Sequence, residues 1–99
     1  NLRIFDDEDK KMNYSLLHQN GEVLIVSQFT LFAKIKKGNR PSWNQAASFK
    51  KGKLLYNKFI KIFNLLYEEQ NIKTGFFGAD MRISLINNGP ATIFFDSKK

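Results

Sequence analysis

The sequence predicts an α+β fold in which a mostly antiparallel, barrel-like β-sheet layer packs against one long helix. Strand-like apolar runs lie before residue 33 and after residue 79. Between them, residues 50–70 carry apolar side chains at helical spacing. The chain has 99 residues, of which 42% are hydrophobic, so we expect residues 1–99 to form a single domain with its own core.

The first half of the chain predicts a turn followed by two strands. Residues 6–11 read as a polar turn, and residues 12–32 read as two strands joined by a hairpin at Asn20-Gly21. In the second strand both faces begin apolar, with Val23 and Ile25 on one face and Leu24 on the other. We therefore expect a central strand that is buried on both faces.

The second half predicts the helix and two last strands. The helix extends over residues 50–70, and Gly52 weakens its first turn. Its expected inward stripe consists of Leu55, Phe59, Ile62, Phe63 and Leu66. Residues 80–87 and 91–96 read as strands around Gly89-Pro90, where the proline marks an edge, a bulge or a turn.

Charge favours a phosphate-bearing partner, because the net charge of +7 is concentrated in one part of the chain. No acidic residue lies between Lys34 and Lys61, and nine of the sixteen basic residues do. They are Lys34, Lys36, Lys37, Arg40, Lys50, Lys51, Lys53, Lys58 and Lys61. The alternative interpretation of this basic patch is a surface that only keeps the protein in solution.

Several classes of protein are disfavoured. No apolar run approaches the ~18 residues of a membrane span, and the start of the chain turns acidic where a signal peptide would be apolar. The absence of cysteine excludes disulfides and thiol catalysis and agrees with a cytoplasmic location. No metal site, phosphate-binding loop or dinucleotide motif is indicated, so we expect no cofactor. His18, the only histidine, lies beside the expected hairpin with no nucleophile motif near it.

The stretch "SQFTLF" is the strongest candidate for a site. Ser27, Gln28 and Thr30 place three hydrogen-bonding side chains at the end of an otherwise apolar strand. Polar groups that are buried there need partners. From the residues alone, two interpretations stay open: the side chains cap the strand end against the following loop, or they form a functional site.

Four motifs in order resemble the D-aminoacyl-tRNA deacylase family. Residues 27–31 read S-Q-F-T-L, and residues 87–92 fit N-x-G-P-x-T, with Ala91 where the family usually has Val. Between them lie K-G-x-R-P-S-W and T-G-x-F-G-A-D-M segments. The resemblance covers residues 2 to 97. Family members carry strands ahead of the position of Asn1, so we expect an N-terminally incomplete portion with an exposed sheet edge.

The resemblance implies hydrolysis of the ester between a D-amino acid, or glycine, and the 3′-terminal adenosine of tRNA, a chiral proofreading step in translation. It implies a homodimer in which Gly89-Pro90 of one subunit reaches into the active site of the other. That peptide bond is cis in the family, and neighbouring carbonyl oxygens hold the substrate's α-ammonium. The pocket then has no room for an L side chain.

The same resemblance assigns roles to single residues. Ser27, Gln28, Phe29 and Thr30 are the catalytic segment, where backbone N–H groups near Phe29 and Thr30 stabilise the developing oxyanion while the ribose 2′-hydroxyl assists. A second interpretation makes Thr30 the nucleophile, but no base lies near it in the sequence.

Further positions are assigned to binding. Asn87 and Thr92, with Gly89 and Pro90, form the second substrate-binding motif. Phe77 and Met81 match positions that line the adenosine pocket, although an aromatic side chain at 77 also suits a core. The basic loop residues Lys34, Lys36, Lys37 and Arg40 would face the phosphates of the acceptor stem.

Two other functions compete with the deacylase. The first is a non-catalytic nucleic-acid-binding module that uses the basic patch; a DNA-binding role has been proposed for a relative in this family. The second is a structural interaction domain whose exposed strand edge recruits a partner.

Overall fold

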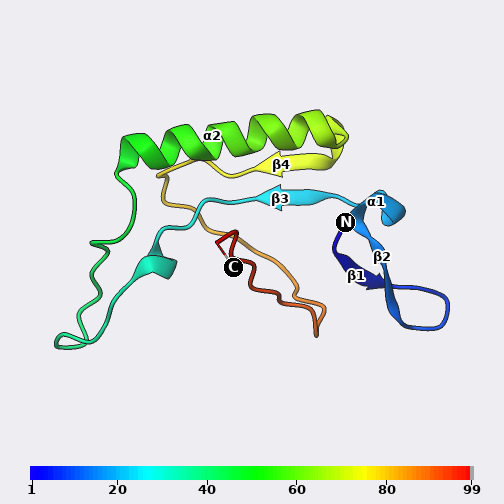
Figure 1. The fold of residues 1–99 in the computed structure, drawn as a ribbon, viewed down its shortest axis with the longest axis horizontal. Helices are drawn as coiled ribbons and strands as arrows, with labels where there is room; N and C mark the ends of the chain where they lie inside the picture. Colours follow the sequence, from blue (N-terminus) through cyan, green and yellow to red (C-terminus); the bar gives the residue numbers. More distant parts are fainter. Residues whose placement is uncertain (99) are drawn as a thin grey trace. The chain divides into compact units, whose positions relative to one another are not determined.

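The structure is a computed structural model that describes residues 1–98 (Figure 1). The chain forms two compact units. The central unit consists of Glu22–Met81, and the terminal unit combines Asn1–Gly21 with the segment from Arg82 onward. The predicted α+β class is confirmed, with a small antiparallel sheet and one long helix.

The terminal unit begins with a short antiparallel pair. Strand β1 (Arg3–Asp6) pairs with β2 (Met12–Ser15), and the register shifts along the pair. The turn between them is held by the Asp7 carboxylate, which accepts from the N–H groups of Asp9 and Lys11, each at 2.9 Å. The one-turn helix α1 (Leu16–Gln19) follows β2 directly.

The predicted hairpin at Asn20-Gly21 is wrong. Asn20 instead ends α1 in the left-handed region, with φ 50°. Strand β3 (Val23–Ile25) then pairs in a different sheet from β2. Asparagine tolerates left-handed backbone both at helix ends and in hairpin turns, so the dipeptide alone does not separate the two.

The central unit is a strand–helix–strand crossover. β3 pairs in parallel with β4 (Ile72–Thr74), so that Val23 lies opposite Ile72. Between the strands the chain forms the 3₁₀ turn η1 (Thr30–Phe32), α2 (Phe49–Leu66) and the 3₁₀ turn η2 (Glu69–Asn71). A parallel pair requires a long connection, and Figure 1 shows α2 running beside the two strands. Ile72, at 8% exposure, is the one buried apolar side chain in residues 1–98.

The sheet expectations need correction. β3 has three residues and one partner, and Leu24 is 57% exposed, so the predicted central strand buried on both faces is wrong. The barrel-like layer is not confirmed, because residues 1–98 form two separate two-stranded sheets. The predicted strands at 80–87 and 91–96 are also absent, and Phe94 is 82% exposed. An apolar run becomes a strand only where another strand satisfies its backbone groups.

Helix α2 confirms the predicted helix but presents a different face to the strands. Ser48 caps its N-terminus by accepting from the Lys51 N–H at 3.3 Å. The less exposed side carries Gly52, Tyr56, Ile60 and Phe63. Of the predicted inward stripe, only Phe63 lies on this side, while the others, Leu55, Phe59, Ile62 and Leu66, are 47–76% exposed. Within residues 1–98, no helix has the length and apolarity to cross a bilayer.

Candidate active site

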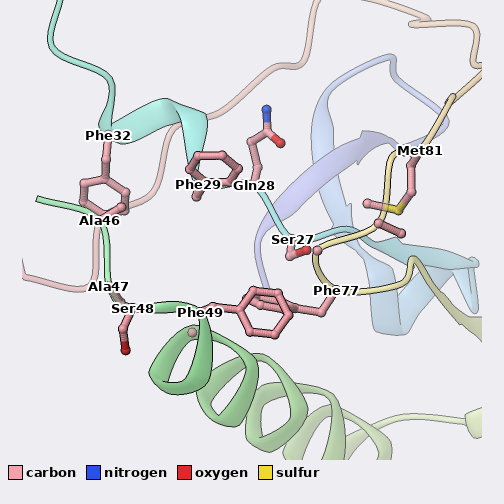
Figure 2. Close-up of a pocket in the computed structure, with 13 residues that line it drawn as sticks. Ser27, Gln28, Phe29, Phe32, Ala46, Ala47, Ser48, Phe49, Phe77 and Met81 are labelled. Atoms are coloured by element: carbon pink, nitrogen blue, oxygen red, sulfur yellow. The ribbon is translucent and has the colours of Figure 1, made fainter. Parts of the chain in front are cut away.

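A cavity of about 510 Å³ lies in the central unit, where the chain leaves both strands and enters α2 (Figure 2). Its wall has three parts: the segment after β3, the start of α2, and the loop after β4. The lining residues are Ser27, Gln28, Phe29, Phe32, Ala46, Ala47, Ser48, Phe49, Gly52, Phe77, Gly78, Ala79 and Met81. Five predicted site residues are therefore brought together from segments about fifty positions apart.

The first wall is the "SQFTLF" segment. Ser27, Gln28 and Phe29 line the cavity, whereas Thr30 does not. Thr30 opens η1, and its hydroxyl oxygen accepts a hydrogen bond from the side-chain amide of Gln28. The backbone N–H groups of Phe29 and Thr30 find no acceptor within residues 1–98. They are therefore available to an acceptor from outside the chain.

The second wall is aromatic. Phe77 meets Phe49 edge to face, with ring centroids 5.2 Å apart, and Figure 2 shows both rings next to the first turn of α2. A Cβ on Gly78, where φ is +75°, would lie 2.5 Å from Cε2 of Phe49. A Cβ on Gly52 would lie 3.0 Å from Cζ of Phe77. A side chain at Gly78 would therefore require Phe49 to move, whereas at Gly52 it would make a tight contact with Phe77.

Met81 completes the cavity beside the strand ends. A Cβ on Gly75 would lie 2.7 Å from Sδ of Met81, so the thioether rests against backbone that has no side chain. Phe77 and Met81, which the resemblance assigns to the adenosine pocket, line this cavity, and so do Phe49, Gly52 and Gly78, which the sequence does not predict. Gly52 alone is marked in the sequence, because glycine inside a helix is unfavourable unless something approaches the backbone closely.

The basic loop is closed at its base. Lys34 and Ser42 exchange two backbone hydrogen bonds, of 2.8 and 3.0 Å, and residues 35–41 form the loop between them. Lys36, Lys37 and Arg40 are exposed on this loop. Directly after its base, Trp43 meets Phe29 edge to face, with centroids 5.5 Å apart. The predicted tRNA-binding segment is therefore anchored next to a residue that lines the cavity.

The "NNGPAT" motif lies in the terminal unit. Its Gly89-Pro90 peptide bond is cis, as the resemblance implies. The Asn87 side-chain amide donates to Oγ1 of Thr92 at 3.4 Å, across the turn. The turn is exposed, and a Cβ on Gly89 would meet nothing within 4 Å. The chain therefore leaves the space beside Gly89 open.

His18 has a local structural partner. Its Nδ1 accepts from the Ser15 N–H at 3.3 Å and lies 3.0 Å from Ser15 Oγ. Ser15 is 3% exposed and is the residue that caps α1. This pairing satisfies the start of the helix in the manner of a capping box, so the close serine and histidine have a structural explanation.

The acidic turn likewise uses its charges locally. The Asn13 side-chain amide and the Lys11 N–H both donate to Asp7, and they lower the pKa of its carboxyl below the usual value. The Tyr14 hydroxyl does the same to the pKa of Glu8. In the part of the chain that the structure describes, no group of three or more His, Cys, Asp or Glu side chains is placed to hold a metal ion.

Comparisons with known proteins agree with the motifs. The family described as D-Tyr-tRNA(Tyr) deacylase matches residues 1–96. The D-aminoacyl-tRNA deacylase of Sulfurihydrogenibium sp. is 55% identical over 98 residues, which cover 99% of this chain and 65% of that protein. The D-aminoacyl-tRNA deacylase of Cytophaga hutchinsonii is 58% identical over 97 residues, which cover 98% of this chain and 64% of that protein.

A solved structure is similar as well. The c-Myc DNA Unwinding Element Binding Protein superposes with a TM-score of 0.83 at 39% identity, covering 94% of this chain and 62% of that one. The chain thus spans about 65% of the length of the curated relatives. The family model matches residues 1–96, and the two relatives are 55% and 58% identical to this chain. This chain therefore belongs to the D-Tyr-tRNA(Tyr) deacylase family.

Proposed function

We propose that this protein hydrolyses the ester bond of D-aminoacyl-tRNA and releases free D-amino acid and tRNA. The observation that carries this proposal is the cavity that joins "SQFTLF" to Phe77 and Met81. Its relatives are named D-aminoacyl-tRNA deacylases, and such names describe an ester hydrolase. Glycine attached to the wrong tRNA has no side chain to exclude, so we include mischarged glycyl-tRNA among the substrates.

The terminal adenosine of tRNA is the part of the substrate that suits the cavity. The volume of about 510 Å³ lies within the usual range for a small-molecule site. Phe29, Phe49 and Phe77 supply aromatic faces, and a nucleobase stacks on such faces without needing a specific sequence. Met81 adds a flexible apolar surface on the strand side.

The chemistry is proposed to rest on position and polarisation. The lining residues include no histidine, carboxylate or lysine that would act as a base. The unpaired N–H groups of Phe29 and Thr30 are the candidate donors to the oxyanion that forms when water attacks the ester carbonyl. Thr30 is the weaker candidate for a nucleophile, since its hydroxyl receives a hydrogen bond from the Gln28 amide and, within the described residues, has no hydrogen bond to a base that could remove its proton.

The Gly89-Pro90 turn is proposed to supply the selection for D substrates across a homodimer. Backbone carbonyls next to the turn would hold the α-ammonium, and an L side chain would then point into the protein. The exposed turn and the open space beside Gly89 support a role outside its own unit. We place the reaction in the cytoplasm, with Lys34, Lys36, Lys37 and Arg40 facing acceptor-stem phosphates.

The test is a deacylation assay on the full-length protein with D- and L-aminoacyl-tRNA side by side. We expect release of the D-amino acid while the L-ester stays intact. Equal hydrolysis of both esters, or of neither, would overturn the proposal. Light scattering on the same sample tests the homodimer.

A second candidate function is non-catalytic nucleic-acid binding. The basic patch favours it, because nine cations and no acid lie between Lys34 and Lys61. A similar solved protein is also named for binding DNA. This candidate predicts duplex binding that weakens with salt and survives Gln28→Ala, a change that the deacylase does not tolerate.

A further inference from the structure

A tyrosine that does not line the cavity is hydrogen-bonded to the two segments that lead into it, one after β3 and one after β4. Tyr56 lies in the second turn of α2, on the side that faces the strands. Its hydroxyl oxygen is 3.1 Å from the carbonyl oxygen of Ile25 and 3.0 Å from that of Gly75. Ile25 is the last residue of β3, and Gly75 directly follows β4. The hydroxyl thus hydrogen-bonds to both segments of the chain at the point where each leaves the parallel strand pair.

The two walls of the cavity begin from these carbonyls. Ser27 follows Ile25 by two positions, and Phe77 follows Gly75 by two positions. The Gly75 N–H also donates to the Ile25 carbonyl, at 2.8 Å, so the junction is bonded from both sides. The ring of Tyr56 lies against that of Phe77, with centroids 5.6 Å apart. A shift of the Ile25 or Gly75 backbone at this junction would therefore also move Ser27 or Phe77, which line the cavity two positions later.

The hydroxyl has a defined hydrogen-bond role here. Tyrosine carries one proton, which is shared between the two carbonyl oxygens. The Ile25 carbonyl keeps a donor without it, namely the Gly75 N–H. The Gly75 carbonyl accepts from no other donor within residues 1–98. Loss of the hydroxyl would therefore release the β4 side of the junction while the pair of strands remains.

We propose that Tyr56 is a positioning residue that sets the spacing between two parts of the cavity wall: the segment after β3, with Ser27, and the loop after β4, with Phe77. The inference rests on the proposed function, because that spacing decides whether a bound adenosine brings its ester to the N–H groups of Phe29 and Thr30. Tyr56 itself touches no substrate, since it does not line the cavity.

The test compares Tyr56→Phe with Tyr14→Phe in the full-length protein. Tyr56→Phe removes one oxygen atom and keeps the ring that packs on Phe77. Tyr14→Phe is the matched control, because its hydroxyl donates at 2.7 Å to Glu8 in the exposed turn of the terminal unit. Each variant is assayed at a temperature at which circular dichroism shows it to be folded.

Two readouts are needed. For Tyr56→Phe we expect kcat for D-aminoacyl-tRNA to fall about three- to tenfold, the effect of one hydrogen bond, with a smaller change in KM. In hydrogen exchange, we expect peptides that cover residues 25–29 and 75–79 to exchange faster. Tyr14→Phe should leave both readouts at the values of the unmodified protein.

The outcomes separate this inference from the proposed function. Absence of deacylation by the unmodified protein would defeat the proposed function, while the exchange readout would still decide whether Tyr56 holds the walls. A lower melting temperature for Tyr56→Phe with unchanged kcat, KM and exchange would show a merely stabilising role and overturn the inference. Equal exchange in the two variants would overturn it too.

Discussion

The cavity of the central unit and the Gly89-Pro90 turn of the terminal unit both depend on glycine, for opposite reasons. At Gly52 and Gly78 the place of a side chain is taken by rings of the same chain, Phe77 and Phe49. At Gly89 that place is empty. At the cavity the two glycines thus make room for rings of the same chain, whereas at the turn the space beside the backbone is open within residues 1–98.

The two kinds of glycine should therefore respond differently to substitution, one in stability and the other in activity. A methyl group at Gly78 must displace an aromatic ring and should change stability first. A methyl group at Gly89 has no neighbour within 4 Å in residues 1–98 and should change only the contact with a molecule outside the chain. Substitutions at the glycines therefore test the comparison directly.

Gly89→Ala should have the largest effect. If the turn receives the substrate's α-ammonium, a methyl group there misplaces the ester, and we expect activity on D-aminoacyl-tRNA to fall by ~10²-fold. Because the new Cβ has no neighbour within 4 Å, the midpoint of thermal unfolding should stay unchanged. Full activity in this variant would remove the turn from the substrate site.

Gly78→Ala should show the largest loss of stability. The residue has φ +75°, and its Cβ would lie 2.5 Å from Phe49. We expect the free energy of unfolding to fall by about 2–3 kcal/mol in urea titrations, from backbone strain plus displacement of the ring. Gly38→Ala is the control, because φ is +61° there with nothing within 4 Å, and it should cost about 1 kcal/mol. Equal losses would mean that Phe49 does not depend on Gly78.

Gly52→Ala should change activity more than stability. Alanine improves the helix by up to ~1 kcal/mol, but its Cβ would push on Phe77 at 3.0 Å. We expect a net change within about 1 kcal/mol in the free energy of unfolding and a KM raised roughly three- to tenfold, because the aromatic wall moves. An unchanged KM would show that Phe77 is not used by the substrate.

The acidic turn should give the smallest effect, since it lies at the surface, where solvent screens its charges. The folded-state pKa of Asp7 is lowered, chiefly by the Asn13 amide, so its stabilisation is present above about pH 4 and is lost as the pH falls through the lowered value. Asp7→Asn should remove a small part of the decline in melting temperature between pH 5 and pH 2.5. An identical decline would show that the turn does not contribute.

The grouping of residues around the cavity was more predictable than the sheet. Ser27, Gln28, Phe29, Phe77 and Met81 could be assigned together from the resemblance to the deacylase family, and the structure gathers them around one cavity. The helix was also found within a few residues. Its less exposed side was not predicted, because α2 is apolar on several sides. That side carries Gly52 and Tyr56, whose hydroxyl binds the strand ends, and a hydrophobic pattern does not rank either residue.

The strands failed for a different reason. Residues 80–87 and 91–96 have strand-like composition, yet a strand needs partners that are distant in sequence. The dipeptide Asn20-Gly21 failed similarly, since one left-handed residue serves a helix end as well as a hairpin. Local sequence patterns thus predicted the secondary structure that each segment favours, whereas strand pairing between distant segments determined which of them form strands.

The two backbone hydrogen bonds between Lys34 and Ser42 hold the ends of the basic loop together independently of the charged side chains at its tip. Its base is fixed by backbone atoms, so the side chains of Lys36, Lys37 and Arg40 take no part in closing it, whereas Gly38 and Asn39 have left-handed backbone that favours those residue types. The charged side chains at the tip can therefore be replaced while Trp43 and Phe29 keep their contact. If the loop contacts acceptor-stem phosphates, as proposed, changes at its tip should alter tRNA affinity without altering the cavity.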